Sequence, residues 1–230
     1  MSKKRSKLRN LYSDSKGNNL FDKEEEWAVK IPRVFGIPIA RFLAWLPIRI
    51  TPNMVTIFSL ILAIFSGYFF YKGNLLYGAL FFLLSYIFDT ADGALARITD
   101  SYTKFGEKLD FYVDTLGNIF MYFGLWYSQY YIFGKWLIGG LIIAIHYAVI
   151  FFGYVCIKNK SYKTIIPYVN TYYGAADEGI LTFFFVPIIG YFTIIFPFLV
   201  LIQLISYIIL FFKQKEKPNI RKNFRSMLKI

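Results

Sequence analysis

The chain has 230 residues, of which 57% are hydrophobic and only 17% are charged. A soluble domain of this length would carry more charge, so the composition excludes an ordinary soluble protein. Several apolar runs approach the roughly 20 residues that cross a bilayer, and they predict a multi-pass membrane protein. The single cysteine, Cys156, excludes an internal disulfide and a thiolate metal cluster.

The first fifty residues differ from the rest of the chain. Residues 1–30 are polar and charged, and they predict a cytoplasmic tail with a short helix near Trp27. Residues 31–50 mix apolar side chains and prolines with Arg33, Arg41 and Arg49, which interrupts them too often for a span. We expect residues 31–50 to form an amphipathic juxtamembrane segment that lies on the membrane surface.

The remaining sequence predicts an all-α integral membrane bundle of six transmembrane helices over residues 51–212, and then a basic cytoplasmic tail over residues 213–230. Thr51 and Pro52 suit the N-cap and the first position of the first helix. Lys72-Gly73-Asn74 predicts a tight turn, and a polar linker is expected over residues 99–105. The expected spans are approximately residues 53–71, 75 into the stretch that begins at Asp89, 107–127, 132–157, 175–189 and 192–212.

The basic residues predict the orientation of these spans. Of the 26 Lys and Arg residues, 24 fall on one side of the predicted topology. Because cytoplasmic loops carry the excess of basic residues, we expect both termini and the linker near residue 100 to be cytoplasmic. The net charge of +12 is then explained by topology and by contact with anionic lipid, without nucleic-acid binding.

Four aspartates interrupt the apolar sequence around this linker. Asp89 and Asp92 lie three residues apart, and Asp110 and Asp114 lie four apart, so each pair shares one helical face. Such acids cost about 2.5–3.5 kcal/mol each at the centre of a membrane helix. Converging carboxylates also repel one another unless cations lie among them. The pattern therefore predicts two Mg²⁺ or Mn²⁺ ions, which prefer hard oxygen ligands and leave positions for phosphate oxygens.

Small and basic residues accompany the aspartates. Gly93 lets a ligand approach the helix backbone, and Ala96 keeps the same groove shallow. Arg97 can contact a phosphate, and Gly106 helps the chain to turn or allows close helix packing. These neighbours favour a phosphate-binding metal site over a structural cluster of acids.

Together the eight residues form the pattern Asp-x2-Asp-Gly-x2-Ala-Arg-x8-Gly-x3-Asp-x3-Asp, and residues 52–56 read Pro-Asn-Met-Val-Thr. Both elements resemble the CDP-alcohol phosphotransferases, also called CDP-alcohol phosphatidyltransferases. The resemblance implies a homodimeric membrane enzyme that cleaves the pyrophosphate of a CDP-alcohol and releases CMP. It implies that the four aspartates hold two metal ions and that Asp114 also takes the proton from the attacking hydroxyl. The residues implied to bind the nucleotide and its phosphates are Asn53, Thr56, Gly93, Ala96, Arg97, Thr103 and Gly106.

The substrates are less defined by the sequence. We expect CDP-diacylglycerol, or its archaeal ether-lipid equivalent, as donor, and a small polar alcohol such as glycerol 3-phosphate, an inositol phosphate or serine as acceptor. An alternative within the family is transfer of a phospho-amino-alcohol from CDP-choline or CDP-ethanolamine to diacylglycerol. Asp177-Glu178-Gly179 faintly resembles an element of those enzymes, but it also suits the dipole of a helix N-terminus.

Two further alternatives remain open. Acids inside a membrane can also line an ion pathway, so a cation-coupled transporter is the rival class outside the family. Cytoplasmic lysines could hold an acceptor phosphate, although positive-inside bias also explains them. The candidate acceptor-binding residues are Lys104, Lys108 and Glu178.

Overall fold

The computed structural model describes residues 27–150 and 179–189, together with residues 12–14, 16, 20, 197–198, 201 and 205. Helices account for nearly all of the two long described ranges, which agrees with the predicted all-α class. The elements are α2 (Trp27–Trp45), α3 (Pro52–Tyr71), α4 (Leu75–Ile98), α5 (Lys104–Tyr127), the π-helix η1 (Ser128–Ile132), α6 (Trp136–Ile150), the π-helix η3 (Leu181–Phe185) and α8 (Val186–Ile189).

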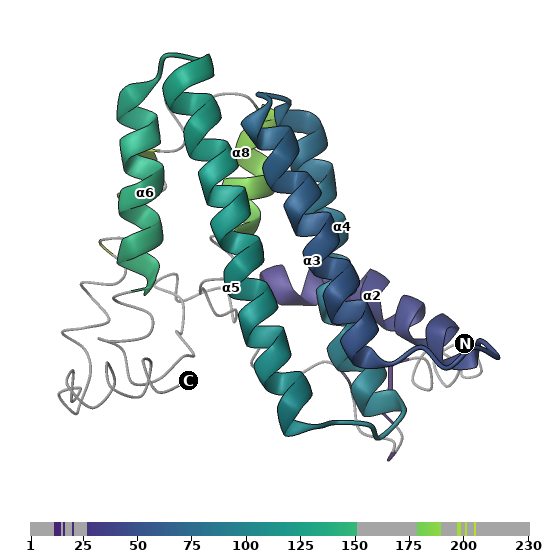
Figure 1. Cartoon of the computed structure of the whole chain (residues 1–230). Helices are drawn as coiled ribbons and strands as arrows, with labels where there is room; N and C mark the ends of the chain where they lie inside the picture. The colour runs from purple at the N-terminus through teal and green to yellow at the C-terminus, as the bar shows by residue number, and fades with distance from the viewer. Residues whose placement is uncertain are drawn as a thin grey trace, which may run out of the picture.

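Three long helices, α3, α4 and α5, run side by side and form the centre of the bundle (Figure 1). α6 lies beside α5, and η3 and α8 pack against α4. α2 runs across the long helices and packs against α4 (Figure 1). α2 continues as a helix through Pro32 and Pro38, and the location of residues 31–50 on the membrane surface stays a prediction.

The first two helices of the bundle begin and end where the sequence predicts. Thr51 is the N-cap of α3 and accepts a hydrogen bond from the backbone N–H of Met54, and Pro52 is the first helical residue. The predicted turn at Lys72-Gly73-Asn74 joins α3 to α4. Gly73 adopts a φ of +76° there, which glycine reaches without steric cost.

The boundaries of the next two helices differ from the prediction. α5 begins at Lys104, three residues earlier than expected, because Thr103 caps it by accepting a hydrogen bond from the N–H of Gly106. At its other end the helix continues as η1 to Ile132, and a turn with Gly134 at a φ of +64° follows. The next helix, α6, therefore starts at Trp136 and not near residue 132. Residues 179–189 of the fifth predicted span are helical and contain η3 and α8, whereas the sixth predicted span lies largely outside the described residues.

Small and hydroxyl side chains bring the helices into contact. A Cβ added to Gly124 of α5 would collide with the backbone carbonyl of Gly67 in α3. A Cβ added to Gly36 of α2 would lie 2.5 Å from Oγ1 of Thr90 in α4. In addition, Ser66 Oγ of α3 donates a 2.8 Å hydrogen bond to the Gly78 carbonyl of α4. Small residues and hydroxyls of this kind hold helices together in lipid, where hydrophobic burial drives no association.

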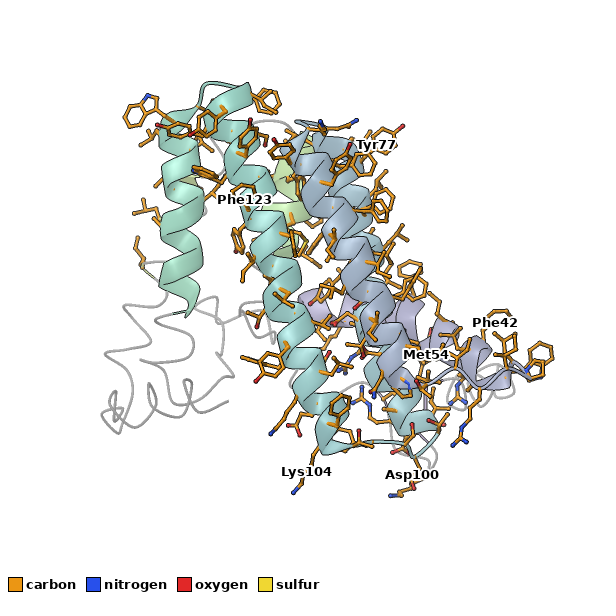
Figure 2. The ribbon with its side chains drawn as sticks, viewed as in Figure 1. Phe42, Met54, Tyr77, Asp100, Lys104 and Phe123 are labelled. Carbon is orange, nitrogen blue, oxygen red and sulfur yellow. The ribbon has the colours of Figure 1, made fainter. Side chains whose placement is uncertain are left out.

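The outward faces of the bundle are apolar. Figure 2 shows apolar side chains along the outer sides of α3 and α4, whereas Asp100 and Lys104 lie at one end of the bundle. By length and composition, α3 and α4 are long and apolar enough to cross a membrane. The exposed large hydrophobic residues of α3 are Met54, Ile57, Phe58, Ile61, Ile64, Phe65 and Tyr68.

The contact between Gly124 and Gly67 predicts a specific stability effect. Substitution Gly124→Ala should destabilise the chain by about 1–3 kcal/mol relative to Gly140→Ala, because a backbone carbonyl cannot move aside cheaply. Gly140 is the matched control, since it is also helical and no atom lies within 4 Å of an added Cβ. Thermal unfolding of both variants in detergent measures the difference, and equal stability would contradict the packing of α3 on α5.

Candidate metal centre

Three carboxylates from two helices meet at one end of the bundle. Asp89 and Asp92 of α4 and Asp110 of α5 each offer an oxygen, and these oxygens all lie within 4.8 Å of one another. The connection between the helices covers only residues 99–103, which brings the end of α4 beside the start of α5. Asp100 has a φ of +50° in this connection, a conformation that aspartate tolerates better than most residues.

Asp92 is held by a hydroxyl from the neighbouring helix. Thr56 of α3 donates a 2.6 Å hydrogen bond from Oγ1 to Oδ2 of Asp92, and both side chains are buried. A hydrogen bond to one carboxylate oxygen fixes the orientation of the other, and this is the usual arrangement around a metal ligand. Thr56 therefore positions Asp92 and does not itself need to contact a ligand.

Asp89 has a buried oxygen for which the described part of the chain supplies no partner. Its Oδ1 is buried and accepts no hydrogen bond from the residues that the structure describes. Asp114 lines the larger cavity together with Asp89, so a further carboxylate faces the same space. A divalent cation would satisfy the buried oxygen. The donor set is composed only of oxygens, so these residues fit Mg²⁺ or Mn²⁺.

A small cavity of about 70 Å³ lies on one side of the carboxylates. It is bounded by α3, the 99–103 connection and the first turns of α5, and it includes Asp92 and Asp110. Gly106 is closely surrounded here, since an added Cβ would lie 3.0 Å from Oδ1 of Asn53 and the Asn53 side chain would have to shift slightly. Six of the residues that the family resemblance assigns to nucleotide and phosphate binding line this cavity: Asn53, Thr56, Gly93, Ala96, Thr103 and Gly106.

The rim of the small cavity also contains an aromatic residue that the sequence did not single out. Tyr102 lines the cavity beside Glu107. The hydrogen bond to the Glu107 side chain raises the pKa of the Tyr102 phenol, because it stabilises the protonated form. Thr103 has a structural task at the same rim, since its hydroxyl caps α5.

A larger cavity of about 460 Å³ also borders the carboxylates. All four aspartates line it, whereas Asp89 and Asp114 do not line the small cavity. Asp92, Gly93 and Asp110 belong to both cavities, so the metal centre lies where the two meet. Arg97 of the motif also lines the larger cavity, and its Nε donates to the Gly93 carbonyl at 3.1 Å.

Several residues of the larger cavity come from outside the motif. Tyr86 of α4 and Asn118 of α5 lie one helical turn beyond Asp89 and Asp114, and Arg33 comes from α2. Helical spacing from the aspartates could have identified Tyr86 and Asn118, but no sequence signal connects Arg33 to them. The candidate acceptor residues Lys104 and Lys108 are exposed and line neither cavity, and Glu178 lies outside the described residues.

The contact between Thr56 and Asp92 predicts the effect of a conservative substitution. Thr56→Val keeps the shape of the side chain and removes its hydrogen bond, so the dissociation constant for Mn²⁺ should rise about 10- to 100-fold. Titration of the purified chain with Mn²⁺, followed by electron paramagnetic resonance, measures this constant. Ser66→Ala is the control, because it removes another α3–α4 hydrogen bond away from the carboxylates. Unchanged Mn²⁺ binding in Thr56→Val would contradict a positioning role.

The CDP-alcohol phosphatidyltransferase family matches residues 49–216 of the chain. An uncharacterized protein of Aquifex aeolicus (strain VF5) is 37% identical over 84 residues, which cover 36% of this chain and 43% of that protein. An archaetidylinositol phosphate synthase of Pyrococcus horikoshii is 36% identical over 76 residues, which cover 33% of this chain and 40% of that protein.

The two relatives align over less than half of their own length, so the family match carries the assignment. That match extends over most of the chain and contains the α3, α4 and α5 helices with all four aspartates. The cluster of Asp89, Asp92 and Asp110 is consistent with the divalent metals that this family uses. The chain therefore belongs to the CDP-alcohol phosphatidyltransferase family, whose members are integral membrane transferases of phospholipid synthesis.

Proposed function

We propose that the chain transfers a phosphatidyl-type group from CDP-diacylglycerol, or from the archaeal ether-lipid analogue, to a small polar alcohol and releases CMP. The observation that carries this proposal is the position of the carboxylate cluster at the junction of two cavities. The small cavity is lined by six of the seven residues that the family pattern assigns to the nucleotide and its phosphates. The other has room for a second substrate. An archaetidylinositol phosphate synthase among the relatives supports a lipid donor over a CDP-linked amino alcohol.

The four aspartates divide into two roles in this proposal. Asp89, Asp92 and Asp110 would hold divalent cations, with Asp114 completing the set. Bound cations would neutralise the charge on the pyrophosphate and on the departing CMP. Asp114 lines only the larger of the two cavities, and this supports a role beside the acceptor alcohol, for which that cavity has room.

The reaction then requires one displacement at the phosphorus that carries the lipid. The acceptor hydroxyl oxygen forms a bond to this phosphorus, and the bond from phosphorus to the bridging oxygen of CMP breaks. Asp114 takes the proton of the attacking hydroxyl, and CMP leaves through the small cavity. Arg97 contacts phosphate oxygens, while Thr56 keeps Asp92 oriented. No covalent intermediate on the protein is needed.

We further propose a cytoplasmic active site, six spans and a homodimer. The cytoplasmic site is supported by the distribution of Lys and Arg, of which 24 in 26 lie on the predicted cytoplasmic side. The metal centre lies near the connection that contains Asp100, at the end of the bundle where charged side chains gather (Figure 2). A site at this surface has access to soluble nucleotides and to the lipid headgroups together.

Asp114 should be essential for turnover. Asp114→Asn removes the base but keeps the size of the side chain, and we expect the rate of CMP release to fall at least about 100-fold. The measurement is CMP release by purified protein in detergent with a CDP-linked lipid donor and a panel of polar alcohols. Asp100→Asn is the control, because Asp100 is exposed and forms an ion pair at the surface, with its Oδ1 3.6 Å from Nζ of Lys16. A near-normal rate of CMP release by Asp114→Asn would contradict the assignment of Asp114 as the base.

Removal of metal should stop the reaction reversibly. Treatment with EDTA should abolish CMP release, and addition of Mg²⁺ or Mn²⁺ should restore it, because the carboxylates alone would repel the anionic donor. The same assay separates the enzyme from the transporter alternative, which predicts no CMP release with any CDP-alcohol. Full activity in EDTA would contradict the metal centre.

A further inference from the structure

Hydrogen bonds recur along the contact between α3 and α4, in a row that ends at the metal centre. Gly78, Ser85 and Asp92 of α4 lie seven residues apart, and positions seven apart fall on nearly the same face of an α-helix. Each of them is joined to α3 by a hydrogen bond that involves a side chain. The predicted metal ligand Asp92 is therefore the last member of a row of contacts that holds α4 on α3.

Ser85 makes the middle contact of this row. Its Oγ donates a 2.9 Å hydrogen bond to the backbone carbonyl of Ser59 in α3, and both side chains are buried. Ser59 lies one turn beyond Thr56, and Ser85 lies one turn before Asp89. Both serines also line the larger cavity together with Asp89 and Asp92. This hydrogen bond thus joins the two helices next to the carboxylates.

The Thr56 hydroxyl makes the alignment of the two helices important, because it has two acceptors within reach. Its Oγ1 lies 2.6 Å from Oδ2 of Asp92 and 3.1 Å from the backbone carbonyl of Pro52 in its own helix. A threonine inside a helix can donate to the carbonyl four residues earlier. If α4 moved along α3, the hydroxyl would keep the Pro52 carbonyl and lose Asp92. The register of the two helices therefore decides whether Thr56 orients Asp92.

Of the two serine contacts in the row, that of Ser85 lies nearer to the metal centre. Ser85 is seven residues from Asp92, or about 10 Å along the helix. The contact from Ser66 to Gly78 lies fourteen residues from Asp92 and close to the turn at residues 72–74, where the chain itself already ties α3 to α4. Loss of the Ser85 contact should therefore allow more movement at Asp92 than loss of the Ser66 contact.

We propose that Ser85 is a positioning residue of the metal centre. Its hydrogen bond to the Ser59 carbonyl holds the register of α3 and α4 in which Thr56 donates to Asp92. This inference rests on the metal centre of the proposed function, but it does not depend on the identity of the donor or the acceptor. Ser85 acts through Thr56 and needs no contact with metal or substrate.

Mn²⁺ binding by Ser85→Ala tests this proposal. The dissociation constant for Mn²⁺, measured by electron paramagnetic resonance without substrate, should rise about 3- to 15-fold, which is the effect expected when a hydrogen bond between membrane helices is lost. Ser66→Ala is the matched control, because it also removes a serine hydrogen bond to a backbone carbonyl between α3 and α4. Both variants should lower the unfolding temperature to a similar extent, but Ser66→Ala should leave Mn²⁺ binding unchanged.

A double variant shows whether Ser85 acts through Thr56. In the Thr56→Val background there is no hydroxyl to align, so Ser85→Ala should cause no further loss of Mn²⁺ affinity. An equal loss in both backgrounds would overturn the proposal, since Ser85 would then affect the metal centre by another route. Unchanged Mn²⁺ binding in the single variant Ser85→Ala would overturn it as well, and so would an equal loss in Ser66→Ala.

These measurements separate the proposal from the transfer reaction, because they use Mn²⁺ alone. If the expected pattern of Mn²⁺ binding is found but no donor yields CMP, the role of Ser85 is supported and the transfer reaction is overturned. If wild-type protein and Ser85→Ala bind Mn²⁺ with the same dissociation constant, only the role of Ser85 is overturned. A wild-type protein that binds no Mn²⁺ overturns both the metal centre and the role of Ser85.

Discussion

Electrostatic repulsion among carboxylates is the constraint on which the rest of the structure depends. Oxygens of Asp89, Asp92 and Asp110 lie within 4.8 Å of one another. Two like charges at such a distance repel by roughly 3–4 kcal/mol at the effective dielectric constant of protein sites. Neither α4 nor α5 would bring these groups together unless other contacts fixed the two helices. The metal centre is therefore a property of the helix packing as much as of the four acids.

That packing is supplied by small residues and hydroxyls away from the chemistry. Gly67 and Gly124 allow α3 and α5 to touch through their backbones, and Ser66 links α3 to α4. In a membrane the helices gain nothing by hiding apolar surface from lipid, so close approach and hydrogen bonds carry the association. Thr56 belongs to the same set of α3 contacts, but its partner is a carboxylate of the metal centre. One helix thus supports both the bundle and the site.

The motif and the local signals were readable from the sequence, whereas the contents of the larger cavity were not. Spacings of three and four residues predicted shared helical faces for the aspartates, and Thr51-Pro52 predicted the start of α3, because both depend on residues close in the chain. Arg33 reaches the cavity only through the crossing of α2 over α4 at Gly36, which no local pattern encodes. The late start of α6 was missed for a related reason, since η1 adds an extra turn after α5.

The position of α2 also bears on how the proposed reaction would join two kinds of substrate. The proposed donor has an apolar tail and a soluble nucleotide, so its reacting phosphorus would lie near the membrane surface. α2 crosses the bundle and exposes Phe42 and Trp45, while its buried face contacts α4 beside Asp89 and Asp92. A helix placed in this way can follow the lipid surface and still define one wall of the reaction cavity.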